Sequence, residues 1–135
     1  MIYYYIPDFY QYYHINLKLL QLIKEKPHIF YDDFKIGAVY GNFPNCIWNG
    51  GRAIFGEHVT LSQMKSISNA FNSLGVPLRL TMTNVMLKDT DVYDRYANYI
   101  MRNMDNGINQ AIVANPMLEE YIRNNYPNYS IIRSV

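Results

Sequence analysis

Apolar and polar residues alternate strictly along the segment 78–83, which predicts a β-strand. The two sides of this strand differ, with Leu78, Leu80 and Met82 on one and Arg79, Thr81 and Thr83 on the other. A parallel strand that is covered on both faces is usually apolar throughout. The pattern therefore predicts a strand with one open, polar face. Asn84 follows at its carboxyl end, where α/β folds hold their ligands.

Helical spacing and capping signals predict four helices. Apolar residues recur on one helical face across 9–26, and Pro27 ends that helix. Thr60 and Gln63 form a capping box that opens a second helix, and Gly75 is expected as its C′ residue. Asp91 is expected to cap a third helix, which ends at 106–107.

The fourth helix and the strands complete the predicted topology. Asn115-Pro116 opens the last helix, with Pro at its first position. Strands are expected at 35–42, 78–83, 110–114 and 130–134, and residues 3–6 are expected to form a short strand or an extended arm. Strands separated by single helices imply right-handed crossovers and a parallel sheet. The predicted fold is α/β, an N-terminal helix followed by β-α-β-α-β-α-β, which is half of a (β/α)8 barrel.

Length and composition indicate one globular domain over residues 1–135. Residues 1–34 would form the N-terminal strand or arm and helix, and 35–135 the βα units. Half of the 135 residues are apolar and 17% are charged, enough for a real core. The net charge of +1 gives no electrostatic footprint for nucleic acid or an acidic membrane.

The single cysteine and the N-terminus indicate a cytoplasmic protein. Cys46 has no second cysteine with which to form an internal disulfide. The segment 1–8 has neither the basic region nor the apolar core of a signal peptide, and no apolar run is long enough to span a bilayer. We therefore expect a reducing, cytoplasmic location and no membrane association.

Several segments together resemble a known family. They are GVPLRLTMTN (75–84), DRYAN (94–98), NQAIVAN (109–115), LEEYIR (118–123) and Tyr126-Pro127. These segments resemble the first half of a TIM-barrel-like domain of uncharacterised bacterial proteins similar to the collagenase-like peptidase and tRNA-hydroxylation family. The resemblance covers residues 35–134 and implies a fold rather than an activity. Several family members hold an iron–sulfur cluster with cysteines of the later half, which this chain lacks, so no cofactor is expected.

A half-barrel leaves its first and last strands with unpaired edges. Self-association, or coverage by the N-terminal helix and the tyrosine-rich N-terminus, would relieve this. We expect a homodimer that completes the sheet or barrel. The chain has 14 tyrosines, concentrated near the N-terminus. They suit either packing at a half-buried surface or a recognition surface for a partner.

Polar residues at the expected strand ends are the candidate ligand-binding residues. Arginines and amides that meet at a barrel mouth would suit an anionic or polyhydroxylated ligand. The candidates are Asn42, Arg79, Thr81, Thr83, Asn84, Asn115 and Arg133. The alternative is that each Asn only turns the chain at the start of a loop.

The long loop 43–58 supplies a further candidate. Glycines at 50 and 51 would let backbone amides approach an anion, and Arg52 would clamp it. A tight turn with a solvated arginine is the alternative. Cys46 and His58 are formally a nucleophile and a base, but a small buried cysteine and an exposed histidine are favoured. The histidines have no metal-ligand spacing, so no metal site is expected.

The sequence thus leaves two classes of function open. The first is a half-barrel that binds a small polar or anionic ligand at the strand carboxyl ends, where any activity requires a second subunit. The second is a non-catalytic interaction, inhibitor or regulatory protein that uses its sheet edges and tyrosine-rich N-terminus. Neither identifies a catalytic residue.

Overall fold

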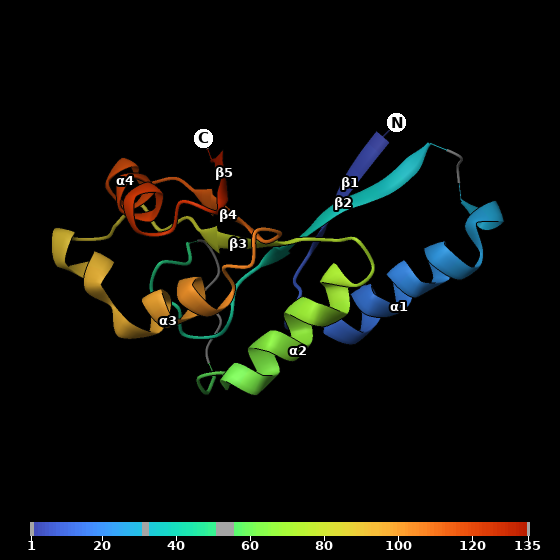
Figure 1. Cartoon of the computed structure of the whole chain (residues 1–135), viewed down its shortest axis with the longest axis horizontal. Helices are drawn as coiled ribbons and strands as arrows, with labels where there is room; N and C mark the ends of the chain where they lie inside the picture. The colour runs from blue at the N-terminus through green and yellow to red at the C-terminus, as the bar shows by residue number, and fades with distance from the viewer. Residues whose placement is uncertain (1, 31–32, 51–55, 135) are drawn as a thin grey trace.

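The computed structural model describes residues 2–30, 33–50 and 56–134, which form an α/β fold around one parallel sheet (Figure 1). The sheet has five strands in the order β1-β2-β3-β4-β5, and each pairs in parallel with the strand before it in sequence. The strands are β1 (Ile2–Pro7), β2 (Phe34–Gly41), β3 (Leu78–Met82), β4 (Gln110–Val113) and β5 (Ser130–Arg133).

One α-helix follows each of the first four strands. The helices are α1 (Tyr13–Glu25), α2 (Leu61–Asn72), α3 (Arg95–Asn103) and α4 (Pro116–Asn125), with 3-10 turns η1 (Pro27–Ile29) and η2 (Asp89–Tyr93). The α/β class and the parallel sheet are as the sequence predicted. The N-terminal segment is a full strand of the sheet rather than an arm, so the order begins with a strand. This sequential order is that of consecutive units of a (β/α)8 barrel.

The two faces of the sheet differ in character. The helix face carries Leu78, Leu80 and Met82, which are fully buried in the main hydrophobic core. The opposite face, called the open face below, carries the half-buried Arg79 and Gln110. Burial of these three side chains against the helices stabilises the fold by roughly 1.5–3 kcal/mol for each.

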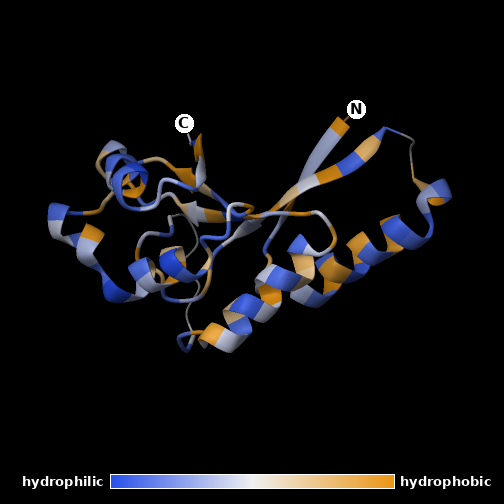
Figure 2. Ribbon diagram, in the orientation of Figure 1, coloured by the Kyte–Doolittle hydropathy of each residue, from blue (hydrophilic) through white to orange (hydrophobic). Residues whose placement is uncertain are grey.

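The helices are amphipathic: hydrophilic and hydrophobic residues are interspersed along each of them (Figure 2). α1 and α2 contact each other, and they lie below β1 and β2 in Figure 1. Rings from outside the regular elements also enter the core, since Phe9, Phe43 and Trp48 are fully buried. The loop after β2 is therefore part of the core.

α1 begins at Tyr13, four residues later than the sequence predicted. Asp8 has a φ of 70°, in the left-handed region, and its carboxylate accepts hydrogen bonds from the backbone N–H groups of Tyr10 and Gln11 at 3.0 and 2.8 Å. Asn16 then donates from Nδ2 to the carbonyl of Pro7 at 2.6 Å. These bonds form a turn between β1 and α1 that competes with helix formation.

The expected cap of the third helix is wrong. Asp91 does not cap α3: its carboxylate accepts a hydrogen bond from the Lys88 N–H at 2.7 Å within the short turn η2. Asp94 is the N-cap, and its carboxylate accepts from the Ala97 N–H at 2.9 Å. Two aspartates three residues apart each suit a first turn, and the sequence pattern did not distinguish them.

The other capping predictions are confirmed. Thr60 and Gln63 form the reciprocal capping box at the start of α2. At its end, Gly75 has a φ of 79°, and the N–H of Val76 donates to the Phe71 carbonyl at 3.1 Å. Together with the Gly75 N–H bond to the Asn72 carbonyl at 2.9 Å, this is a Schellman motif.

β1 and β5 form the two edges of the sheet. Within the described ranges, each pairs with one neighbour only. Tyr3, Tyr4 and Tyr5 of β1 are 50%, 48% and 48% exposed. None of the helices in the described part of the chain has the length and apolar character needed to cross a membrane.

Candidate functional site

The polar residues that follow β2 and β3 hold the long loop in place. Asn42 is fully buried, and its Nδ2 donates to the carbonyl of Thr81 at 2.8 Å. Its Oδ1 accepts from the Phe43 N–H at 2.8 Å. Both ends of this amide are therefore used inside the protein, and Asn42 joins the end of β2 to β3.

The hydroxyls of β3 and of the residue after it bond to the same loop. Thr81 donates from Oγ1 to Oδ1 of Asn49 at 2.8 Å, and Thr83 accepts at Oγ1 from the Gly50 N–H at 3.2 Å. Asn84 donates from Nδ2 to the Ile47 carbonyl at 2.8 Å. The structure thus gathers Asn42, Thr81, Thr83 and Asn84 at the carboxyl end of β3, as a cluster that anchors the loop.

Gly50 fits closely against this cluster. A Cβ at this position would lie 2.5 Å from the carbonyl oxygen of Thr83, which is backbone and has little freedom to move. Nearby, Trp48 donates from Nε1 to the Asp91 carbonyl at 2.8 Å, and its ring is fully buried. The first part of the loop is thereby fixed as far as Gly50.

The remaining strand-end candidates lie apart from the cluster. Asn115 is the N-cap of α4, where its side chain accepts from the Met117 N–H at 2.9 Å. Arg133 pairs in register with Val113 on the helix face, and it bonds Glu119 from Nε at 2.8 Å. Arg79 is on the open face, so the two strand arginines do not converge. Arg52 lies outside the described residues.

Arg79 is held in position by groups from two other strands. Its guanidinium carbon lies 4.2 Å from the centroid of the Tyr5 ring on β1, and its Nε donates to Oε1 of Gln110 on β4 at 2.6 Å. The ion pairs in the described ranges join Glu119 to Arg123 and Arg133. Arg79 therefore has no carboxylate partner among the residues described.

Glu119 carries both of those ion pairs. The hydrogen bond from Arg133 and then that from Arg123 lower the pKa of its carboxyl group, and the same contact raises the pKa of Arg133. Both arginine side chains are largely exposed, at 75% and 51%. Exposed pairs of this kind contribute little to stability. Arg133 therefore forms a surface ion pair with the first turn of α4.

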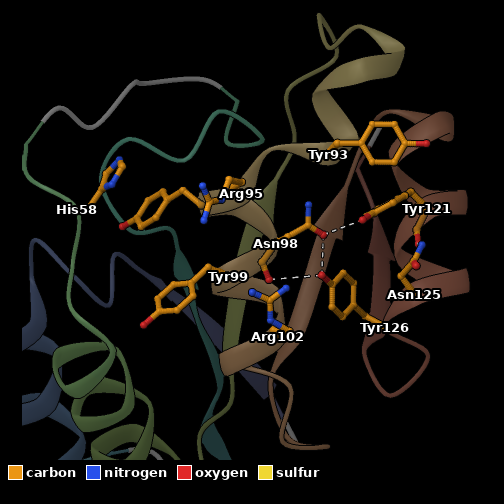
Figure 3. A pocket seen from close by; sticks show the side chains of 10 residues that line it. His58, Tyr93, Arg95, Asn98, Tyr99, Arg102, Tyr121, Asn125 and Tyr126 are labelled. Carbon is orange, nitrogen blue, oxygen red and sulfur yellow. Dashed lines mark hydrogen bonds between the residues drawn. The ribbon is translucent and has the colours of Figure 1, made fainter.

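A concave region lies between α3 and α4, on the helix side of the sheet (Figure 3). It has a volume of about 930 Å³, and its walls are made mainly of tyrosine and arginine side chains. We call it the tyrosine groove and define it by Tyr93, Arg95, Tyr96, Tyr99, Arg102 and Tyr121. None of these residues is among the ligand-binding candidates predicted from the sequence. The spacing of Arg95 and Arg102, seven residues apart on one helix face, was the available signal.

Asn98 forms the floor of the tyrosine groove. Its Oδ1 accepts hydrogen bonds from the hydroxyls of Tyr121 and Tyr126 at 2.8 and 2.6 Å (dashed in Figure 3). Its Nδ2 donates to the carbonyls of Val92 and Asp94 at 2.9 and 2.8 Å. All four bonding positions of this buried amide are filled, so α3 and α4 are joined at one point.

Cys46 and His58 do not form a catalytic pair. Burial raises the pKa of the Cys46 thiol to about 12, so it is protonated at neutral pH. His58 is exposed, and its ring stacks on Tyr96 at a centroid distance of 3.9 Å. Among the residues described, no group of three or more His, Cys, Asp and Glu side chains is arranged to hold a metal ion.

Comparison with protein-family models, curated proteins and solved structures gave no match. The candidate sites therefore rest on the geometry of this chain alone. Of the sequence-based candidates, Arg79 has side-chain donors left for a ligand. Tyr5 and Gln110, which position it, were not identified from the sequence because they lie on other strands.

Proposed function

We propose that this chain binds a small polar or anionic ligand on the open face of its sheet, with Arg79 as the anchor. One observation carries the proposal: Arg79 is fixed by Tyr5 and Gln110 yet has no carboxylate partner among the described residues. A guanidinium has five N–H donors. The bond to Gln110 uses Nε, and within the described ranges the two terminal nitrogens have no hydrogen-bond partner, which leaves them for a carboxylate or phosphate.

The surroundings of Arg79 support this role. The side chain is half-buried, and partial removal from water strengthens its attraction to an anion. The Tyr5 ring and the Gln110 amide hold the guanidinium before a ligand arrives, so less conformational entropy is lost on binding. The loop-anchoring cluster at Thr81 and Thr83 would form the rim of the site.

The proposal gives the chain a binding role, and any turnover would need groups from a second subunit. We also propose that the protein is cytoplasmic, because its single buried cysteine suits a reducing compartment. No residue of the open face among those described pairs a nucleophile with a base. Binding is therefore the property to measure.

Thermal unfolding in the presence of inorganic phosphate and of citrate tests the proposal. We expect both anions to raise the melting temperature of the wild-type chain, and Arg79→Gln to abolish the rise while leaving the far-UV circular dichroism unchanged. Arg133→Gln is the matched control, because it removes a strand arginine from the opposite face. An equal rise in wild type and Arg79→Gln would refute the assignment.

A specific feature of β1 favours a second candidate function, protein association through the sheet edge. The N–H of Ile2 donates to the carbonyl of Asp33, just before β2, at 2.7 Å, and the N–H of Asp8 donates to the carbonyl of Tyr40 in β2 at 2.6 Å. Because successive N–H groups of a strand point to opposite sides, those of Tyr3 and Tyr5 point away from β2, towards the unpaired edge. An edge with half-exposed aromatic side chains is a template for another strand, and we propose a second copy of the chain as the partner.

The solution mass across a concentration series tests this association. We expect a dimer that Tyr3→Pro disrupts, because proline removes the outward N–H and is tolerated in an edge strand. Tyr3→Thr is the control, since it keeps the backbone N–H and supplies a side chain that suits a strand. A monomer at every concentration, or a dimer that both variants leave intact, would exclude pairing through β1.

A further inference from the structure

The tyrosine groove combines flat aromatic rings with two arginines on one helix. Arg95 and Arg102 are seven residues apart on α3, so they lie on the same face about 10 Å apart along the axis. Both are exposed, and neither is in an ion pair with the carboxylates of the described residues. Tyr99 lies between them on the same helix and also borders the groove (Figure 3).

Some rings of the groove are held in place by hydrogen bonds, and others are exposed. Asn98 holds the hydroxyls of Tyr121 and Tyr126, which fixes those two rings from below. Tyr93 is 73% exposed, and Tyr99 is half-buried. The groove thus combines rings held in place by Asn98 with exposed aromatic surface on which a ligand can stack.

One contact shows that a planar ring stacks well in this groove. The imidazole of His58 lies 3.9 Å from the centroid of Tyr96, and the two rings are within 8° of parallel. His58 comes from an exposed segment before α2, far from Tyr96 in the sequence. A flat ring from elsewhere in the chain therefore already packs face to face on a groove tyrosine.

We propose that the tyrosine groove binds a planar aromatic molecule that carries an anionic group, of the size of a mononucleotide. The tyrosine faces would stack on the aromatic ring, and Arg95 or Arg102 would bind the anionic group bidentately. The volume of about 930 Å³ lies within the range of small-molecule sites. This site is separate from Arg79, which lies on the open face of the sheet, so the two proposals stand independently.

Isothermal titration with AMP, adenosine and inorganic phosphate tests the proposal, since the three probes separate ring stacking from charge. Fluorescence of Trp48 is a second readout, because the only tryptophan lies edge-on to Tyr121 at a centroid distance of 5.8 Å. We expect saturable binding of AMP that is tighter than that of either adenosine or phosphate. We also expect AMP binding to change the Trp48 emission.

Substitutions locate the binding site. Arg95→Gln or Arg102→Gln is expected to weaken AMP binding about tenfold, because the glutamine amide can keep one hydrogen bond of a bidentate contact and loses the other. Arg123→Gln is the matched control: it removes an exposed arginine of α4 that pairs with Glu119 outside the groove. Absence of AMP binding to the wild-type chain overturns the proposal. So does binding that Arg79→Gln abolishes and both groove variants retain, because the nucleotide would then occupy the open face.

Discussion

The guanidinium carbon of Arg79 lies 4.2 Å from the centroid of the Tyr5 ring, although β2 separates their two strands in the sheet. Gly37 of β2 makes this contact possible. A Cβ at Gly37 would lie 2.7 Å from Cε1 of Tyr5, so a side chain there would occupy the space of the ring. The tyrosine therefore crosses β2 over a glycine to reach the arginine.

Substitution of Gly37 tests whether this contact positions Arg79. We expect Gly37→Ala to displace the Tyr5 ring and to reduce the phosphate-dependent rise in melting temperature, while the chain still folds because a side chain rather than backbone must move. Gly56→Ala is the control, since among the residues described its Cβ would meet Pro44 alone, at an ordinary 3.6 Å. An unchanged response to phosphate in Gly37→Ala would mean that Tyr5 does not orient the guanidinium.

Gly50 should be far less tolerant of substitution than Gly37. Its added Cβ would meet the Thr83 carbonyl at 2.5 Å, which is backbone, and would also disturb the bond from its N–H to the Thr83 hydroxyl. We expect Gly50→Ala to cost about 1–3 kcal/mol, as overpacking does. Urea unfolding measures this cost, and a midpoint equal to that of Gly56→Ala would contradict the close fit.

Asn98 should be the most costly of the α3 polar residues to remove. Asn98→Ala leaves the Tyr121 hydroxyl and the Val92 carbonyl without their partner. The Tyr126 hydroxyl and the Asp94 carbonyl each lose one bond but keep a bond to the backbone of residue 98. With about 1–3 kcal/mol for each buried group that stays unsatisfied, we expect a loss of at least about 2 kcal/mol in the free energy of unfolding. Asn125→Ala, at an exposed site with one local bond, should change it by less than about 1 kcal/mol.

Cys46 should be unreactive in the native state and should make stability fall at high pH. Its pKa rises from 9.0 to about 12 through burial, so the folded state disfavours the thiolate. The resulting contribution to the free energy of unfolding is fully present below pH 9. It is lost as the pH rises from 9 to 12, because the thiol ionises in the unfolded state before it ionises in the folded state. A thiol reagent should label the chain only after unfolding, and Cys46→Ala should show a shallower decline. Fast native labelling at pH 8 would contradict this.

Local signals predicted the fold better than they predicted the site. The capping box at Thr60, the Schellman glycine Gly75 and Asn115-Pro116 are each set by neighbouring residues, and all are confirmed. The membership of β1 in the sheet depends on pairing with residues about thirty positions away, which no local pattern reveals. That pairing decides between the strand and the extended arm that the sequence left open for residues 3–6, and it gives the sheet its fifth strand.

The candidate site depended on which face each side chain occupies. Arg133 sits on the helix face because β5 pairs Ile131 with Ala111 and Arg133 with Val113, a register that a shift of one residue would reverse. Asn42 was expected among the ligand-binding residues, and it anchors the loop after β2. The tyrosine groove was missed because it requires α3 and α4 to be neighbours, and the sequence shows each helix separately.

The unbroken order of the five strands has a consequence for synthesis on the ribosome. Each strand pairs with the one that precedes it in the chain, so every newly emerging βα unit finds its docking surface already made. From β2 onwards, each strand can pair as soon as it is made, because the strand beside it has already been synthesised. Growth of the sheet can therefore keep pace with translation, from β1 towards β5.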